Sequence, residues 1–308
     1  MTGVGRQSAV PVLDIGGTHV TAALAEPVGG TVLPGTRHRM PLAADAPAGA
    51  IIDVIARCAG TLDVGTAARW GVAVPGPFDY ANGIGLFAGV GKFDALYGVD
   101  LRTALLNRLG GRASEMVFVN DAEAFLLGEW RFGVARGSDR VVGITLGTGV
   151  GSAFLSDGTV IDDDPAVPPQ GRVDLLTVAG RPLEETVSRR AIRARYAEVA
   201  GFATSPPDVG EIADGARSGD TLARTVFDEV FTALGSALAP WLASFRATVL
   251  VIGGSMSGSL DLIKGPLWTG IGAVIPHSPA SWRPVAAAHH EESALLGAAY
   301  RAGVRPPP

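Results

Sequence analysis

Short glycine-rich turns follow three apolar segments of this sequence. The turns are Asp14-Ile15-Gly16-Gly17-Thr18, Gly147-Thr148-Gly149-Val150-Gly151 and Gly253-Gly254-Ser255. Glycine has no Cβ, so neighbouring backbone N–H groups can point at one anion and form a phosphate cradle. One such turn is common in ordinary hairpins, but three after three apolar segments favour a site for nucleotide phosphates. No Gly-Lys-Ser/Thr follows them, which disfavours a P-loop of the Walker type.

Asp14 places a carboxylate at the end of the apolar segment 9–15. A carboxylate in a buried strand is costly unless it is paired or acts on a cation or a proton. Two interpretations are open. Asp14 either stabilises its turn by accepting the N–H of Gly17 or Thr18, or it lies close to Mg²⁺ and to the nucleotide phosphates that share the ion.

The polar pair Asn120-Asp121 ends another apolar segment and precedes a predicted helix over residues 122–132. Asp121 is either a plain helix N-cap or a general base. In the second case it takes the proton of a substrate hydroxyl as that hydroxyl attacks a phosphoryl group. Asn120 would then bind a substrate hydroxyl by hydrogen bonding.

The composition describes a globular protein with an acidic balance. The 308 residues carry a formal net charge of −5, 47% of them are hydrophobic and 18% are charged, which excludes disorder as a description of the whole chain. The acidic balance argues against a nucleic-acid partner. A single cysteine, Cys58, excludes a disulfide framework and a cysteine-cluster zinc site. No signal peptide and no run of 18 apolar residues occur, so we expect a cytoplasmic protein with no membrane partner.

Strand patterns alternate with helix patterns along the chain, which predicts an α/β protein with mostly parallel strands. Apolar runs predict strands, and helical spacing predicts helices. The predicted strands cover 9–15, 20–25, 70–74, 117–119, 141–146 and 248–252. The predicted helices cover 46–62, 100–109, 122–132, 183–199, 208–218, 222–245 and 291–303. Residues 157–170 form the strongest candidate loop, and no internal sequence repeat is found.

These motifs, in this order, resemble the ROK family of sugar kinases within the actin-like ATPase (ribonuclease-H-like) superfamily. The resemblance runs from about residue 10 to residue 303. Besides the three turns, it rests on Pro75-Gly76-Pro77-Phe78-Asp79, Asn120-Asp121-Ala122-Glu123-Ala124, Gly128-Glu129 and Ala294-Leu295-Leu296-Gly297-Ala298-Ala299.

The resemblance implies two actin-like α/β lobes with a nucleotide and sugar cleft between them. Residues 1–119 plus 290–308 would form the smaller lobe, and residues 120–289 the larger one. ATP and Mg²⁺ would be required, and the protein would be a homodimer. Asp121 would be the general base, Asn120 a sugar ligand and Gly254 the adenosine contact. The implied phosphate contacts are Asp14, which would reach Mg²⁺ through water, with Gly16, Gly17, Thr18, Thr148 and Gly149.

One segment departs from the family pattern. Where the family has Glu, Gly and His, this chain has Arg172, Asp174 and Leu175, and the zinc cysteines that normally follow are absent, so no zinc is expected. Leucine cannot hydrogen-bond, so specificity should change on that side of the sugar. Arg172 and Asp174 either replace the missing contacts or are surface residues. Glu184 is either a sugar-hydroxyl acceptor or a carboxylate favoured by the dipole at a helix N-terminus.

Three further candidates come from residues 89–101. Lys92, Asp94 and Tyr97 are either substrate contacts or ordinary loop residues. His19, which follows the first turn, lies either near a phosphate or on a solvent-facing strand.

The sequence therefore predicts an ATP-dependent kinase. Its substrate hydroxyl would be the exocyclic CH₂OH of a hexose, an amino sugar or a sugar-like cyclitol. The alternative is a sugar- or nucleotide-binding regulatory protein of the same fold with little kinase activity. The family's transcription factors carry an N-terminal winged-helix region, and only about a dozen residues precede the first strand here.

Overall fold

The computed structural model describes residues 9–201, 206–289 and 291–304. These residues divide into two compact units, which are described separately. The first unit runs up to Phe132 and resumes at Glu292, and the second is Gly133–Glu291. In the described part of the chain, no helix is both long enough and apolar enough to cross a membrane.

The first unit is built on a mixed sheet in the order β3-β2-β1-β5-β8, with β4 paired to β2. Strands β1, β5 and β8 are parallel, whereas β2 is antiparallel to β1, β3 and β4. The apolar run of each strand is buried, as its composition requires. The strands are β1 (Val10–Ile15), β2 (His19–Glu26), β3 (Thr31–Val32), β4 (His38–Pro41), β5 (Ala68–Val74) and β8 (Ala113–Asn120), and a separate short ribbon joins β6 (Phe78–Asp79) to β7 (Ile84–Gly85).

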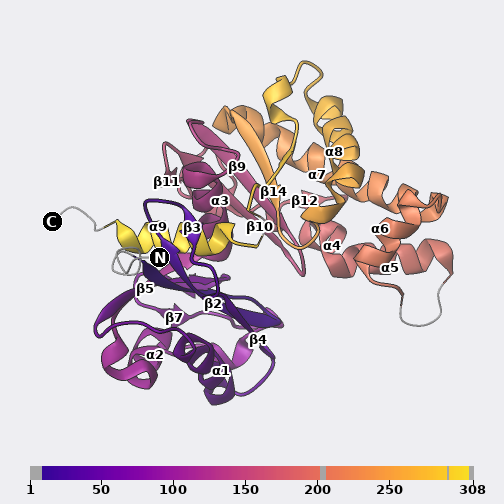
Figure 1. The fold of residues 1–308 in the computed structure, drawn as a ribbon. Helices are drawn as coiled ribbons and strands as arrows, with labels where there is room; N and C mark the ends of the chain where they lie inside the picture. The colour runs from indigo at the N-terminus through magenta and orange to yellow at the C-terminus, as the bar shows by residue number, and fades with distance from the viewer. Residues whose placement is uncertain (1–8, 202–205, 290, 305–308) are drawn as a thin grey trace. The chain divides into compact units, whose positions relative to one another are not determined.

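Helices cover both faces of this sheet (Figure 1). The face with α1 and α2 holds an apolar core that includes Ile51 and Ile55 of α1 and Leu13 and Ile15 of β1. Helices α3 and α9 cover the other face. Asp100 caps α2 by accepting the N–H of Thr103 at 2.9 Å, as the sequence predicts. The helices are α1 (Ala48–Gly60), α2 (Leu101–Leu109), α3 (Asp121–Phe132) and α9 (Ser293–Gly303), with 3₁₀ turns η1 (Asp94–Leu96) and η2 (Gly110–Arg112).

Helices α3 and α9 touch backbone to backbone. A Cβ at Gly297 would overlap the carbonyl of Ala124, and a Cβ at Gly128 would overlap the carbonyl of Ser293. The fully buried Glu129 also bonds the Ser293 hydroxyl at 2.5 Å. Helix α3 lies in the first unit together with α9. The lobe boundary after residue 119 stays a prediction.

The second unit repeats the strand plan of the first. Its sheet has the order β11-β10-β9-β14-β15, in which β9, β14 and β15 are parallel and the β9–β10–β11 part is antiparallel. Both sheets are thus mixed rather than mostly parallel, because each begins with a hairpin at a glycine turn. The strands are β9 (Arg140–Leu146), β10 (Val150–Ser156), β11 (Thr159–Val160), β14 (Val249–Gly253) and β15 (Val285–Ala286).

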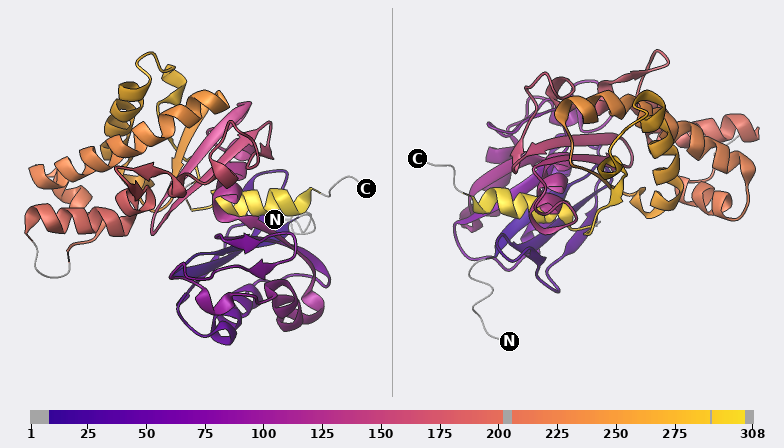
Figure 2. Two further views of the ribbon diagram at one scale, coloured as in Figure 1. Left: turned by 180° about the vertical axis from the view of Figure 1, so that it is seen from behind. Right: turned by 90° about the horizontal axis from the view of Figure 1, so that it is seen from above.

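The long helix α7 packs along α8, again through glycines. A Cβ at Gly235 would overlap the Leu267 carbonyl, and a Cβ at Gly270 would overlap the Thr232 carbonyl. Figures 1 and 2 show α5 and α6 beside α7 and away from the sheet. The helices are α4 (Glu184–Val187), α5 (Arg189–Ala200), α6 (Val209–Arg217), α7 (Thr221–Phe245) and α8 (Leu260–Val274). The shorter pieces are η3 (Pro169–Gly171), η4 (Val173–Leu175), β12 (Thr177–Val178), β13 (Arg181–Pro182), η5 (Ser257–Ser259) and η6 (Ala280–Trp282).

Two predictions about this unit were wrong. The single helix expected over 183–199 breaks at Ser188, which has extended backbone and caps α5 by accepting the N–H of Ala191. Helix α8 was not predicted, because Pro266 and its glycines interrupt the helical pattern.

Candidate active site

The first glycine turn closes the β1–β2 hairpin. The last paired residues are Ile15 and Val20, and the Gly16 N–H donates to the His19 carbonyl at 2.9 Å. A Cβ built on Gly17 would have nothing within 4 Å, so the backbone is accessible there to a ligand. The sequence-predicted Gly16, Gly17 and Thr18 are therefore grouped on one exposed turn.

Two carboxylates gather beside this turn, although they are far apart in the sequence. Asp14 lies on β1, and Asp121 opens α3 directly after β8. Burial, and then the charge of Asp121, raise the pKa of Asp14 to about 7, while Arg39 opposes the rise. Burial also raises the pKa of Asp121, and the nearby charge of Lys92 works against it. The carboxylates repel each other, so a bound cation or proton would stabilise the pair.

Asn120, and not Asp121, performs the main capping of α3. Its Oδ1 accepts the N–H of Ala122 at 2.9 Å and of Glu123 at 3.3 Å. Asp121 Oδ1 accepts the adjacent N–H of Ala122, at 2.9 Å. The Asn120 Nδ2 donates to the Tyr80 hydroxyl at 2.8 Å, and a second N–H on this nitrogen remains for a substrate oxygen. Sequence reasoning missed Tyr80, although it directly follows the Pro75–Asp79 motif.

The segment 89–101 contributes one charge to this group. Lys92 acts electrostatically on Asp121. Asp94 is exposed, begins η1 and accepts the N–H of Val90 at 3.2 Å, and the Tyr97 side chain is exposed. The structure therefore connects Lys92 to the carboxylate pair, whereas the contacts of Asp94 are those of a loop residue.

The second and third glycine turns pack on each other within the second unit. The second turn closes the β9–β10 hairpin, where Leu146 pairs with Val150. Gly254 has a φ of +83° and a Cβ there would overlap the Leu146 backbone, so this position requires glycine. The Met256 N–H donates to the Leu146 carbonyl at 3.0 Å. The second turn, which contains Thr148 and Gly149, therefore lies against the third turn, which contains Gly254.

Glu184 lies against the second turn from the first residue of α4. Its Oε2 accepts the N–H of Val150 at 3.5 Å, and a Cβ on Gly149 would stand 3.0 Å from that oxygen. The Arg189 N–H donates to the Gly147 carbonyl at 2.9 Å. The break at Ser188 thus fastens both ends of α4 to the glycine turn and positions the carboxylate.

Arg172 and Asp174 bind each other in the segment that departs from the family pattern. Arg172 Nη2 and Nε lie 2.6 Å and 3.2 Å from the two carboxylate oxygens of Asp174. The Ser152 hydroxyl holds this segment on β10 by donating to the Gly171 carbonyl at 2.6 Å and accepting the Val173 N–H at 3.0 Å. Leu175 is exposed.

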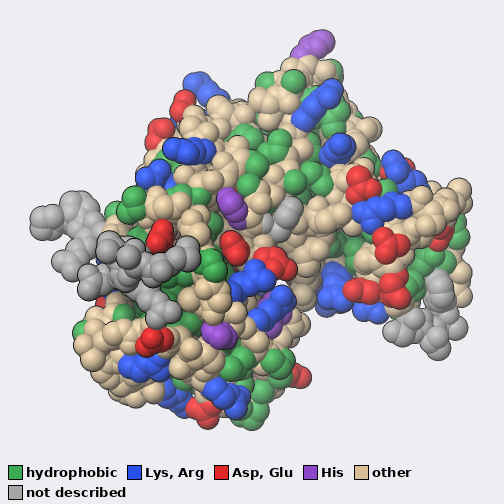
Figure 3. All heavy atoms as spheres, viewed as in Figure 1, with side chains coloured by type: hydrophobic (Ala, Val, Ile, Leu, Met, Phe, Trp, Pro, Cys, Tyr) green, Lys and Arg blue, Asp and Glu red, His purple; other side chains and the backbone are tan. Residues whose placement is uncertain are grey.

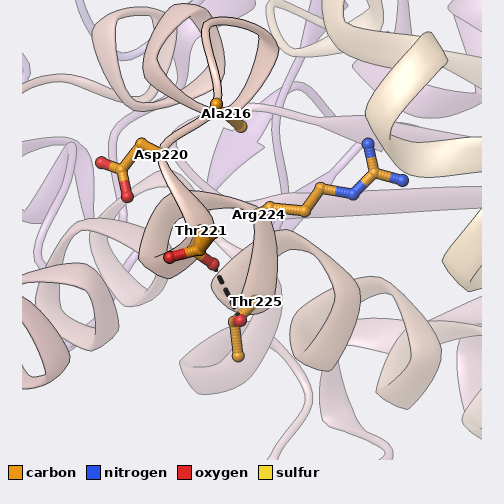
Figure 4. Close-up of a pocket in the computed structure, with 6 residues that line it drawn as sticks. Ala216, Asp220, Thr221, Arg224 and Thr225 are labelled. Carbon is orange, nitrogen blue, oxygen red and sulfur yellow. Dashed lines mark hydrogen bonds between the residues drawn. The ribbon is translucent and has the colours of Figure 1, made fainter.

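A shallow depression at the start of α7 is separate from all of these groups (Figure 4). It is lined by Ala216, Gly219, Asp220, Thr221, Arg224 and Thr225. Its carboxylate, Asp220, is occupied by the N–H groups of Leu222 and Ala223 and by the Tyr196 hydroxyl. None of the predicted site residues lines it.

The residues beside the first turn fit a magnesium ion that is shared with phosphates. Mg²⁺ is typically held by one or two carboxylates, by waters and by the substrate phosphates, and Asp14 would supply such a carboxylate. Within residues 9–201, 206–289 and 291–304, no group of three or more His, Cys, Asp or Glu side chains is arranged to hold a metal on its own.

The chain is similar to known proteins over most of its length. The model of the ROK family matches residues 11–167 and 178–303. A glucokinase of Thermotoga maritima is 32% identical over 272 residues, which cover 80% of this chain and 84% of the relative. A glucokinase of Streptomyces coelicolor is 27% identical over 317 residues, covering 93% and 95%.

The fold is likewise shared with solved structures. A ROK family glucokinase of Streptomyces griseus in complex with glucose and AMPPNP superposes with a TM-score of 0.79 at 24% identity, covering 94% of this chain and 98% of that one. The two α/β units therefore form the actin-like fold of sugar kinases. The chain belongs to the ROK family.

Proposed function

We propose that this protein is an ATP-dependent kinase that phosphorylates the exocyclic CH₂OH group of a hexose or of a close analogue. The observation that carries the proposal is the carboxylate pair Asp14 and Asp121 beside an open glycine turn, in a chain of the ROK family. The match to glucokinases makes glucose the first substrate to test.

Asp121 acts as the general base in this proposal. Its carboxylate accepts the hydroxyl proton while the hydroxyl oxygen forms a bond to the γ-phosphorus, the bond from that phosphorus to the β,γ-bridging oxygen breaks, and ADP leaves. Burial supports this role, because a carboxylate whose pKa is raised toward neutrality is a better proton acceptor. The charge of Lys92 acts to lower this pKa and so favours the ionised carboxylate that accepts the proton.

The remaining site residues bind and orient the reactants. The N–H groups of the turns at Gly16–Thr18 and Thr148–Gly149 hold phosphate oxygens, and Gly254 contacts the adenosine. Mg²⁺, when bound near Asp14, neutralises charge on the phosphates. Asn120 donates to a sugar hydroxyl through its second N–H, and Glu184 accepts from another. The homodimer stays a prediction.

Specificity on one side of the sugar is proposed to differ from that of the typical family member. Arg172 and Asp174 form a closed ion pair, and Leu175 offers no hydrogen bond. This protein should therefore accept an amino sugar or a cyclitol that lacks the usual polar group on that side. A family member with Glu and His at these positions should accept it less well. Asp94 and Asp174 stay candidate contacts.

The test is Asp121→Asn in an ADP-release assay across hexoses, amino sugars and cyclitols. The rate of phosphoryl transfer should fall about 10²–10⁴-fold, which is the usual contribution of a general base, while the Kd for ATP changes little. Asp53→Asn is the matched control, because Asp53 is an exposed carboxylate of α1 paired with Arg108. An Asp121→Asn variant that retains wild-type turnover would refute the role of Asp121. Sugar binding with no turnover by the wild-type protein would support the regulatory alternative instead.

A further inference from the structure

Three side chains form a row across the first unit's sheet, next to the first glycine turn. The register pairs Asp14 of β1 with Thr21 of β2, and Thr21 with Arg39 of β4. Paired residues of neighbouring strands project from the same face of a sheet. His19 is two residues before Thr21, so it projects from this face as well. The sheet therefore brings Arg39, from a polar strand that sequence reasoning did not predict, beside the phosphate turn.

Arg39 is held by the turn itself. Its Nη2 lies 3.0 Å from Nδ1 and 2.5 Å from Nε2 of His19, and the Thr18 hydroxyl lies 2.8 Å from the same Nδ1. A guanidinium only donates hydrogen bonds and a neutral imidazole accepts at one nitrogen, so only one of these two ring nitrogens can accept from Arg39. Burial and then the charge of Arg39 lower the pKa of His19, which fits a neutral ring. Thr18 and His19 thus contact and support the Arg39 guanidinium.

Arg39 acts electrostatically on Asp14 and His19, but no carboxylate is in contact with its guanidinium. Seven other arginines of the described chain lie within 3.3 Å of a carboxylate, namely Arg69, Arg108, Arg172, Arg189, Arg195, Arg217 and Arg224. Among the described residues, Arg39 forms no such pair, and its side chain is exposed. Figure 3 shows basic and histidine side chains gathered on the surface over β2 and β4. An exposed arginine with no carboxylate in contact is suited to bind a dianionic ligand such as a phosphate group.

We propose that Arg39 binds the terminal phosphate of the phosphoryl donor, and that Thr18 and His19 position its guanidinium for this contact. The inference rests on the proposed kinase function and adds a residue to it. Arg39 shares a row with Asp14, which lies beside the base Asp121, so the contact falls at the reacting end of the donor. A planar guanidinium fork binds two phosphate oxygens at once and stabilises the charge that they carry during transfer.

The test compares ATP with ADP. By calorimetry, Arg39→Ala should weaken ATP binding about tenfold and change ADP binding less than twofold, because ADP lacks the terminal phosphate. In the ADP-release assay its kcat should fall about 10²-fold. Arg39→Lys should recover part of kcat, since lysine restores the charge but not the fork. His19→Gln, which keeps a hydrogen-bond acceptor, should lose less than His19→Ala. Arg37→Ala is the control, because it removes an equal charge next to β4 from an arginine 3.8 Å from Glu292.

Each outcome decides the proposal. A selective loss for ATP in Arg39→Ala, with normal behaviour of Arg37→Ala, supports it. Equal losses for ATP and ADP together with a lower melting temperature would show that Arg39 only fastens β4 to β2, and would overturn it. Normal kcat in Arg39→Ala would overturn it while leaving the kinase function intact. If the wild-type protein turned over no sugar, the kinase function would fail, and the difference between ATP and ADP binding would still decide the role of Arg39.

Discussion

The two units share one plan but differ in the charges around their glycine turns. Each sheet starts with a hairpin and continues in parallel strands, and each unit has two helices packed through glycines. The first strand of the hairpin ends at Ile15 in the first unit and at Leu146 in the second. The residue just before that end is Asp14 in the first unit and Thr145 in the second. The first turn also has one more unpaired residue, since Ile15 pairs with Val20 whereas Leu146 pairs with Val150. The additional residue is His19.

Under the proposed function, this difference would separate phosphate binding from the chemical step. Both turns offer backbone N–H groups, but Asp14, Asp121, Lys92 and Arg39 all belong to the first unit. Beside the second turn the structure places hydroxyls and Glu184. The glycine turn is therefore the common device, and the charged side chains make one copy of it suitable for proton and phosphoryl transfer.

The largest effect is expected from substitutions at Asp14 and Thr145, which occupy equivalent positions in the two hairpins. Asp14→Asn should lower kcat about 10²–10³-fold, the usual cost of removing one electrostatic partner of the transferring group. Thr145→Ala should cost less than tenfold, because a hydroxyl supplies no charge. Both are measured by ADP release at saturating sugar and ATP. Equal losses would contradict the division between chemistry and binding.

A smaller effect is expected at a feature that the two units share, the pair of helices packed through glycines. Gly297→Ala and Gly270→Ala each force a Cβ into a backbone carbonyl, so each should reduce the free energy of unfolding by about 1–3 kcal/mol. Gly272→Ala on α8 is the control, because its Cβ has nothing within 4 Å. It should raise stability by about 0.5–1 kcal/mol, since alanine favours a helix. Urea unfolding measures the stability of all three variants. If Gly297→Ala and Gly270→Ala unfold at the same urea concentration as the wild type, the helix contacts adjust to the added methyl group and the prediction is wrong.

The stability of the protein should also depend on pH through Asp14 and not through Thr145. Burial raises the pKa of Asp14 to about 7 in the folded protein, so the folded state favours the neutral carboxyl. Its stabilising contribution is complete below the usual pKa near 3.8 and is lost as the pH rises through 7. The slope is at most about 1.4 kcal/mol per pH unit.

The measurement is urea unfolding without nucleotide or Mg²⁺ at pH 5 and pH 8. Asp14→Asn should gain stability relative to the wild type as the pH rises, because asparagine does not ionise. Thr145→Ala should follow the wild type. A constant difference between Asp14→Asn and the wild type would mean that Asp14 titrates normally.

The smallest effects concern helix caps, one in each unit. Asp100 of α2 accepts one N–H, from Thr103, and Asp100→Ala should cost about 1 kcal/mol. Asp220 of α7 accepts two N–H groups and the Tyr196 hydroxyl, so Asp220→Ala should cost more. The ranking is read from melting temperatures, and the reverse order would contradict it.

The hairpins, the glycine turns and the carboxylate at residue 121 were predictable because each is encoded locally. An apolar run that stops at glycine predicts a strand and a turn, and residues 10–26 and 140–156 follow this pattern. A family resemblance then assigned roles that spacing alone left open.

The features that were missed depend on contacts between distant residues. Strand β4 is polar and has no apolar run, and Arg39 meets His19 only through the pairing of β4 with β2. Helix α8 contains Pro266 and Gly270, which look like helix breakers, yet Gly270 is what allows close packing on α7. Asn120 rather than Asp121 caps α3 because its side chain reaches the Ala122 and Glu123 N–H groups.

The late position of helix α9 in the sequence determines when α3 gains its packing partner during synthesis. Helix α9 follows every predicted site residue in the sequence, yet it packs directly on α3, which carries Asp121. Growing chains fold while they leave the ribosome, but α3 gains this backbone neighbour only after residues 293–303 have been translated. A chain that stopped before residue 293 would therefore contain every predicted site residue and still lack the helix that supports the proposed general base.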